Sequence, residues 1–435
     1  MSTVRMSTVQ MSTGDEELTA EVRAWIASNW NSDLLLREWW LRLAEAGLSH
    51  PAWPVGVGGR GLSSAQARIV ATEIGRAGAI AAPNGHLGAT LAAPTILAHG
   101  TPEQIRQFVW PIATGEAAWC QLFSEPGSGS DLASVGTKAE RDGDEWVING
   151  QKVWNSAADT AQFGLLVART DPDLPKHKGL TYFLLDMTQA GVQARPLKQM
   201  NGMSNFCEVF ITDARVPNAD ILESLGDGWR VVQTTLAAER ANLSGRLASG
   251  ATAARSGPVS GDLDLPVGEI IRRARTVKVS RIPSGAVPAK MMVELAQEHG
   301  ARADPVIRQD VARYVTQTKI DGWTARRIAA AQGRLTGADG SILKLATSRI
   351  CQFSRDLSFS IIGAHALLRG LDAPLDGDLY RIGLGSPGNR LGGGTDEIQL
   401  NVVGERGLGL PREPSDDQNL PYSAFKVGTQ TNKGG

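Results

Sequence analysis

A change in the periodicity of apolar residues divides this chain into three stretches, and their order is the feature that most constrains its fold. Residues 13–115 space their apolar side chains at the helical period, residues 117–217 form short strand-like runs, and residues 226–409 return to the helical period. The many short runs and turn signals of the middle stretch are typical of a small antiparallel sandwich or barrel. The sequence therefore predicts an α+β fold in which a β module lies between two helical parts.

The two ends of the chain differ in composition from the rest and set the outer domain boundaries. The first residues repeat Met-Ser-Thr three times, so we expect residues 1–12 to be a disordered leader. The last residues are rich in Pro, Gly and polar side chains, so we expect residues 411–435 to form an extended tail. Between them we predict an N-terminal helical domain over 13–116, a middle β domain over 117–222 and a C-terminal helical bundle over 223–410.

Composition excludes several classes of function. The formal net charge is −1 and the pI is near 6.6, which indicates no nucleic-acid partner and leaves a small molecule as the expected one. No apolar run reaches the ~18 residues of a membrane-spanning helix. Cys120, Cys207 and Cys351 are far apart in apolar segments, so we expect reduced thiols, a cytoplasmic location and no metal site.

Three stretches carry a resemblance to a known family. They are residues 119–170, with "FSEPGSGSD" and "GQKVWNSA", residues 200–217, "MNGMSNFCEVFITDARVP", and residues 392–411, "GGGTDEIQLNVVGERGLGLP". In this order they resemble the acyl-CoA dehydrogenase family over nearly the whole chain. The resemblance implies a C-terminal four-helix bundle, with FAD bound where the middle β domain meets it. It also implies an acyl-CoA substrate, an electron-transfer flavoprotein as acceptor, and a homo- or hetero-oligomer built as a dimer of dimers.

The same resemblance assigns residues to the cofactor. In "SEPGSGSD" the small residues leave backbone N–H groups free to reach a flat, polar heterocycle. By similarity, the residues that contact the cofactor are Phe123, Ser124, Gly129, Ser130, Trp154, Ser156, Thr395 and Glu397. Ser130 also lines the neighbouring CoA channel, and Thr395 and Glu397 face the FAD of a neighbouring subunit. Taken without the resemblance, the Gly-rich segment is an ordinary loop and Trp154 a core aromatic residue.

The reaction that the resemblance implies needs a base for the α-proton of the thioester. A carboxylate in a dry pocket suits that role because desolvation raises its pKa. In the family's commonest arrangement this Glu directly precedes the Gly-Thr of the C-terminal signature, where the present chain has Gly393. The backbone N–H of Gly393 is still expected to donate to the thioester oxygen. A second arrangement in the family places a Glu before an Arg on the first long bundle helix, which corresponds here to Glu239 and Arg240.

Helical spacing supports a buried position for Glu239 independently of the resemblance. Val232, Leu236, Glu239 and Leu243 fall at i, i+4, i+7 and i+11 and share one apolar stripe. A carboxylate on such a stripe is costly unless it is paired or functional. Two interpretations follow: Glu239 is the α-proton base, or it forms a structural ion pair, with Arg246 or with another helix.

Arg240 likewise has two interpretations, as the family's arginine that orients the substrate or as a surface residue.

Two departures from the family pattern concern FAD. Residues 256–305 lack the Arg-x-x-Phe-Gly segment whose arginine reaches the FAD pyrophosphate, and the Gly-Gly turn near adenine is Ile362-Gly363-Ala364. Relatives with such an altered segment include mixed tetramers that act on bulky thioesters such as steroid side chains.

The resulting hypothesis is an oxidoreductase of β-oxidation and lipid metabolism, which converts an acyl-CoA to the trans-2-enoyl-CoA with FAD as hydride acceptor. Two alternatives stay open. One is a non-catalytic partner subunit of a mixed acyl-CoA dehydrogenase tetramer. The other is a flavin monooxygenase or oxidase on the same fold, against which a base at Glu239 argues.

Overall fold

The structure is a computed structural model. It describes residues 13–83, 87–245, 254–276, 282, 285–330, 337–370, 373–412, 414 and 419–424. The predicted leader, residues 1–12, lies outside the described residues.

The N-terminal part is a group of helices packed around tryptophan side chains. Its helices are α1 (Thr13–Asn29), α2 (Leu36–Glu45), α3 (Ser64–Arg76), α4 (Ala93–His99) and α5 (Pro102–Ala113). Thr101 begins α5 because its hydroxyl accepts a hydrogen bond from the Gln104 N–H at 3.2 Å, one turn into the helix. Trp39 and Trp40 are fully buried, and their indole N–H groups donate to backbone carbonyls, so this core leaves neither ring nitrogen without a partner.

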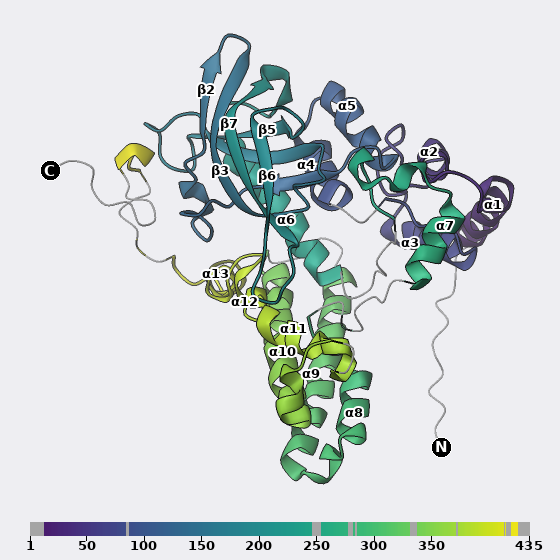
Figure 1. Cartoon of the computed structure of the whole chain (residues 1–435). Helices are drawn as coiled ribbons and strands as arrows, with labels where there is room; N and C mark the ends of the chain where they lie inside the picture. The colour runs from purple at the N-terminus through teal and green to yellow at the C-terminus, as the bar shows by residue number, and fades with distance from the viewer. Residues whose placement is uncertain are drawn as a thin grey trace.

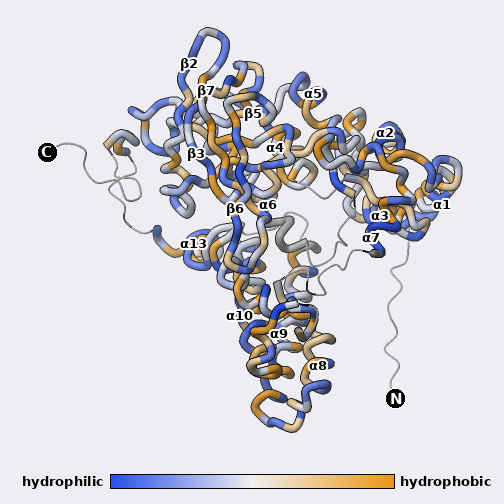
Figure 2. Tube along the Cα trace, viewed as in Figure 1, coloured by the Kyte–Doolittle hydropathy of each residue, from blue (hydrophilic) through white to orange (hydrophobic). Residues whose placement is uncertain are grey.

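The middle part is one sheet of eight strands with the order β6-β7-β3-β2-β4-β5-β8, in which β1 pairs with β4. The strands are β1 (Trp119–Leu122), β2 (Lys138–Asp142), β3 (Glu145–Ser156), β4 (Phe163–Arg169), β5 (Leu180–Asp186), β6 (Val192–Leu197), β7 (Phe206–Pro217) and β8 (Ile221–Leu222). The predicted antiparallel pairing holds for most of the sheet, and β4 adds parallel pairings with β1 and β2. β1 enters directly from the helical part rather than through a hairpin, which permits parallel pairing. The tip of the β2–β3 hairpin is hydrophilic and projects from the sheet (Figure 2).

The C-terminal part is a helical bundle centred on one long helix. Its main helices are α6 (Gly228–Gly245), α8 (Ala289–Glu298), α9 (Pro305–Ala330) and α10 (Asp339–Ile362), and three short ones follow, α11 (Asp378–Gly385), α12 (Gly388–Leu391) and α13 (Asp396–Val402). α10 contacts α6, α8, α9 and all three short helices. α8, α9 and α10 extend away from the sheet, whereas α6 reaches up to it (Figure 1).

One segment within the predicted bundle range packs elsewhere. Residues 254–276, which include α7 (Val267–Thr276), lie against the N-terminal helices (Figure 1). Leu263, Val267 and Ile270 join the same apolar core as Trp39. The backbone N–H of Val267 donates to the carbonyl of Leu34 at 2.9 Å. The first part of the altered segment 256–305 therefore packs with the N-terminal helices, whereas α8 belongs to the bundle. The domain boundaries stay predictions.

The described end of the predicted tail is docked on the β domain. The backbone N–H of Tyr422 donates to the carbonyl of Leu174 at 2.9 Å, and its ring centroid lies 3.8 Å from the guanidinium carbon of Arg169. Within the described parts of the chain, no helix has the length and apolar character to span a bilayer, and no group of three or more His, Cys, Asp or Glu could hold a metal ion. The candidate site lies around β1, which contacts β3 through Asn155 and α6 through Glu239.

Candidate active site

The glycine-rich loop after β1 presents polar groups beside a buried ring. Phe123 is buried and packs edge-on against Tyr182, with ring centroids 5.8 Å apart. The carbonyl of Ser124 accepts a hydrogen bond from the Val153 N–H at 2.9 Å, which ties the loop to β3. Gly129 and Ser130 are exposed, and their backbone N–H groups donate to no described acceptor. The loop therefore offers free donors at the surface of a fixed scaffold.

A buried ion pair fixes this loop. Lys152 is fully buried, and its ammonium donates to the carbonyls of Phe123 at 3.1 Å and Val167 at 2.8 Å and to the Glu125 carboxylate at 2.8 Å. Glu125 also accepts from two backbone N–H groups further along the loop. Burial alone would raise the pKa of Glu125, yet the Lys152 ammonium and these donors hold that pKa below its usual range. The sequence reasoning did not identify this pair.

Trp154 is turned out of the sheet by an irregularity in β3. The pairing of β3 with β7 shifts register between Lys152 and Asn155, and Trp154 has a φ of 63°. A left-handed conformation is uncommon for a bulky residue and requires support from its surroundings. The indole is 59% exposed and meets Phe206 edge-on. This exposure argues against the core-aromatic interpretation and leaves a flat aromatic face available to a ligand. Ser156 is half-buried and ends the same strand.

Glu239 lies on α6 at the edge of the apolar cluster that joins the sheet to this helix. Val232, two turns earlier on the predicted stripe, is fully buried, and Glu239 itself is half-buried. The side-chain amide of Gln121, on β1, donates to the Glu239 carboxylate over 3.4 Å. The side chains of Arg240 and Leu243, and all of Arg246, lie outside the described residues.

Sequence reasoning missed Gln121, although the alternation of β1 contains the signal. Trp119 and Phe123 point to the same face as Gln121 and are buried in one apolar cluster. A polar side chain between two apolar ones on a strand face is the pattern that marks it. Its partner on α6 could not be read from the sequence.

The C-terminal signature forms a second group of candidate residues, supported by α10. Gly393 and Gly394 have φ values of 68° and 82°, so this turn uses a left-handed conformation that glycine adopts readily. The Gly393 N–H donates to no described acceptor, and its role as a backbone donor stays a prediction. Thr395 is the N-cap of α13, since its hydroxyl accepts from the Ile398 N–H at 3.2 Å. Glu397 is exposed.

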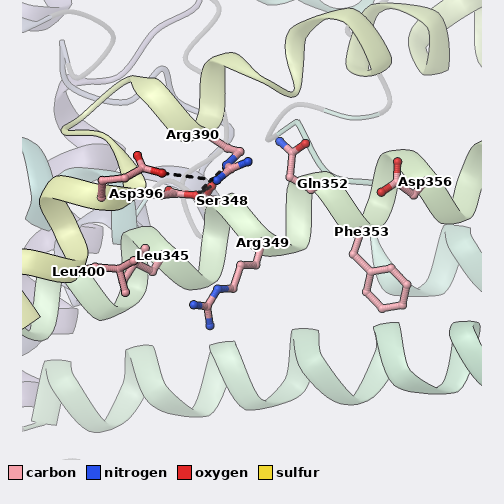
Figure 3. Close-up of a pocket in the computed structure, with 10 residues that line it drawn as sticks. Leu345, Ser348, Arg349, Gln352, Phe353, Asp356, Arg390, Asp396 and Leu400 are labelled. Atoms are coloured by element: carbon pink, nitrogen blue, oxygen red, sulfur yellow. Dashed lines mark hydrogen bonds and ion pairs between the residues drawn. The ribbon is translucent and has the colours of Figure 1, made fainter.

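Asp396 anchors this turn to α10. Its carboxylate lies 2.8 Å from the Lys344 ammonium. It also lies 2.9 Å from the Ser348 hydroxyl and 3.1 Å from the Arg390 guanidinium (Figure 3). Burial opposes ionisation of Asp396, but these three donors together lower its pKa below the usual range. A cavity of about 390 Å³ lies beside them, and Arg349 points away from Asp396 there (Figure 3). α10 contacts both α6 and α13, so one helix supports both groups of candidate residues.

The arrangement fits a flavin. An exposed indole can stack on a planar ring, and the free N–H groups of Gly129 and Ser130 can donate to its polar edge. Glu239, a carboxylate at an apolar edge, and Gly393, whose N–H has no described acceptor, are groups of the kinds that serve as base and oxyanion donor in α-proton abstraction. These features are compatible with a site of the flavin dehydrogenase class.

Comparison with known proteins agrees with this class. The chain matches the family models "Acyl-CoA dehydrogenase, N-terminal domain" over residues 12–116, "middle domain" over 120–214 and "C-terminal domain" over 290–408. It is 36% identical over 420 residues to acyl-CoA dehydrogenase IpdE1 of Mycobacterium tuberculosis, covering 92% of this chain and 98% of IpdE1. It is 39% identical over 370 residues to acyl-CoA dehydrogenase FadE34 of the same organism, covering 85% of this chain but only 46% of FadE34.

Two solved assemblies share the fold. The structure described as the Tcur3481-Tcur3483 steroid ACAD has a TM-score of 0.67 and 27% identity, covering 93% of this chain and 100% of that one. The ChsE4-ChsE5 complex of Mycobacterium tuberculosis has a TM-score of 0.63 and 28% identity, with the same coverage. The chain therefore belongs to the acyl-CoA dehydrogenase family, a family of oxidoreductases, which confirms the resemblance and the predicted fold class.

Proposed function

We propose that this protein catalyses the FAD-dependent α,β-dehydrogenation of an acyl-CoA thioester to the trans-2-enoyl-CoA, with Glu239 as the α-proton base. The observation that carries the proposal is the position of Glu239. Its carboxylate lies at the edge of the apolar cluster that also contains Phe123, the first residue of the glycine-rich loop. A base and a flavin-binding loop are thus held on one packed scaffold.

Each candidate residue has a proposed role in the dehydrogenation. The Glu239 carboxylate accepts the α-proton, and the Gly393 N–H donates to the thioester oxygen, where enolate charge develops. The flavin would be held by Phe123, Ser124, Gly129, Ser130, Trp154 and Ser156. The FAD of a neighbouring subunit would contact Thr395 and Glu397. Ser130 and Arg240 contact the substrate. FAD, when bound, would accept the hydride that leaves the β-carbon.

We further propose a bulky acyl group, such as a steroid side chain. Support comes from relatives whose structures are named a steroid ACAD and a two-component complex, and their assembly also favours an oligomer of this chain. An electron-transfer flavoprotein is the proposed acceptor. Cys120, Cys207 and Cys351 are buried and form no disulfide, and a cytoplasmic location is part of the proposal.

The test is Glu239→Gln in protein that carries FAD. We expect anaerobic addition of acyl-CoA to bleach the flavin of the wild type, and the variant to lose at least about 10³-fold in bleaching rate because its amide accepts no proton. Glu140→Gln, at an exposed carboxylate on β2, is the matched control and should bleach normally. Undiminished bleaching by Glu239→Gln, with FAD retained, would exclude Glu239 as the base.

A second candidate function is a non-catalytic subunit that completes the FAD site of a partner chain. The two-component neighbours favour it, as does the segment 256–305, which lacks the arginine motif for the FAD pyrophosphate. Such a subunit, purified alone, would be colourless and would gain no activity with any acyl-CoA. A yellow, active preparation of the chain alone would exclude it.

A further inference from the structure

Gln121 is a polar residue on an otherwise apolar face of β1. Trp119 and Phe123, two residues to either side, are buried in the cluster that joins the sheet to α4, α5 and α6. Cys120 and Leu122 point to the opposite face and belong to the separate core of the sheet. A primary amide at such a position costs free energy unless its polar atoms are satisfied. The group that bonds to the Gln121 amide therefore indicates why a polar residue occupies this position of β1.

That partner is the candidate base. Gln121 Nε2 donates to Glu239 Oε2 over 3.4 Å, across the junction between β1 and α6. The two residues are 118 positions apart, so only the packing of α6 on the sheet brings them together. The distance is at the long end of the hydrogen-bond range, and such contacts often tighten when substrate binds.

The main chain at Gln121 is itself held in place. The side-chain amide of Asn155 is buried and donates to the Gln121 carbonyl at 2.6 Å. Asn155 directly follows Trp154, the exposed indole assigned to the flavin. Gln121 also pairs with Leu165 in the parallel β1–β4 ladder. The amide that meets Glu239 is thus mounted on the strand that leads into the flavin loop and is braced by the strand that carries Trp154.

We propose that Gln121 is a positioning residue for the α-proton base: its amide fixes the Glu239 carboxylate in register with the flavin loop. This inference rests on the proposed function of Glu239. A glutamate side chain has three rotatable bonds, and a misplacement of about 1 Å from the reacting atom can cost about 10²-fold in rate. In the step itself the α C–H bond breaks, its electron pair stays on the enolate, and the proton goes to Glu239. Gln121 remains neutral and transfers no proton.

The experiment isolates proton abstraction from hydride transfer. The full-length protein with FAD is mixed in D₂O with a 3-thia-acyl-CoA, whose sulfur at position 3 cannot release a hydride. Uptake of deuterium at the α-carbon is followed by mass spectrometry, and the dissociation constant of the analogue and the FAD content are measured in parallel. The variants are Gln121→Leu, which removes the amide, and Gln121→Asn, which keeps the amide but shortens its reach. Gln107→Leu, on the exposed side of α5, is the control.

We expect both Gln121 variants to exchange 10- to 100-fold more slowly (about 1.4–2.7 kcal/mol), with FAD content unchanged and analogue affinity within about threefold of the wild type. Gln107→Leu should match the wild type. In the background of Glu239→Gln, Gln121→Leu should cause no further loss, because the group it positions is already gone.

The same variants test the base role of Glu239 and the positioning role of Gln121 separately. If the wild type exchanges, Glu239→Gln does not, and both Gln121 variants stay within about twofold of the wild type, Gln121 has no positioning role and the base assignment stands. If Glu239→Gln exchanges as fast as the wild type, the base assignment falls and the role of Gln121 falls with it. A loss in Gln121→Leu that Gln121→Asn fully restores would also overturn the proposal, since the shorter amide cannot bridge the same distance.

Discussion

At the scale of single residues, a buried histidine couples the stability of the N-terminal domain to pH. The ring of His50 is buried, its Nδ1 lies 2.7 Å from the Ser49 carbonyl oxygen, and Nε2 has no partner among the described residues. Burial lowers the pKa of His50 from 6.5 to about 3. Between these values the unfolded chain takes up a proton that the folded chain refuses, so stability falls as the pH falls.

We predict that the wild type loses about 2 kcal/mol more stability than His50→Gln between pH 7 and pH 5, because each unit below the unfolded pKa contributes about 1.4 kcal/mol. Urea unfolding of both proteins at the two pH values measures the difference. His365→Gln, at an exposed histidine, should leave the pH dependence of the wild type unchanged. Equal losses in the wild type and His50→Gln would show that His50 is not buried in the neutral form.

At the scale of elements, a buried hydroxyl cluster seats α6 against α4 and β5. Thr235 Oγ1 lies 3.0 Å from Thr95 Oγ1 and 2.9 Å from the Tyr182 hydroxyl, and all three side chains are fully buried. Burial raises the pKa of Tyr182 above its usual range, so its hydroxyl stays protonated. Glu239 follows Thr235 by one helical turn. This cluster therefore fixes the position of α6, and with it the candidate base, relative to α4 and β5.

We predict that Thr235→Val destabilises the protein by about 1–3 kcal/mol, because it leaves the buried Tyr182 hydroxyl without this partner. Tyr182→Phe should cost about 0.5–1.5 kcal/mol, because the Thr235 hydroxyl keeps its contacts with Thr95 and with the Val231 carbonyl. The double variant should lose less than the sum, since both changes break the same hydrogen bond. Denaturant unfolding of the wild type, the two single variants and the double variant completes this double-mutant cycle. Thr316→Val, on the exposed face of α9, should change stability by less than about 0.5 kcal/mol. Additive losses would mean that the two hydroxyls are independent.

What the sequence could predict depended on whether the signal was local. The helical stripe of α6 and the strand runs follow from neighbouring residues, and the resemblance to the family indicates Glu239 and the loop at 123–130 as candidate site residues. The partner of Glu239 was out of reach because that contact joins positions 118 apart. The docking of residues 254–276 on the N-terminal domain was missed for the same reason, since it depends on pairing with residues near Leu34.

At the scale of the whole molecule, α12, α13 and the turn that follows them lie on one flank of the bundle (Figure 1), and this stretch of chain carries several exposed apolar side chains. Leu391, Leu400, Leu408 and Leu410 are 49–72% exposed within twenty residues of chain. Large apolar side chains clustered in this way on a folded protein mark a contact surface. The same flank holds Thr395 and Glu397, the residues proposed to face the FAD of a neighbouring subunit, so assembly and cofactor binding should depend on one surface.

We therefore predict that Leu400→Glu combined with Leu408→Glu dissociates the oligomer and lowers its FAD content, because two buried charges at an interface cost several kcal/mol. Light scattering coupled to size-exclusion chromatography gives the mass, and the flavin absorbance of the same peak gives the FAD content. Val55→Glu, an equally drastic change at an exposed loop residue of the N-terminal domain, controls for charge and should alter neither. If the double variant forms an oligomer of the same mass as the wild type, this flank is not the interface. A dissociated variant that keeps all its FAD would show that each subunit binds the cofactor without its neighbour.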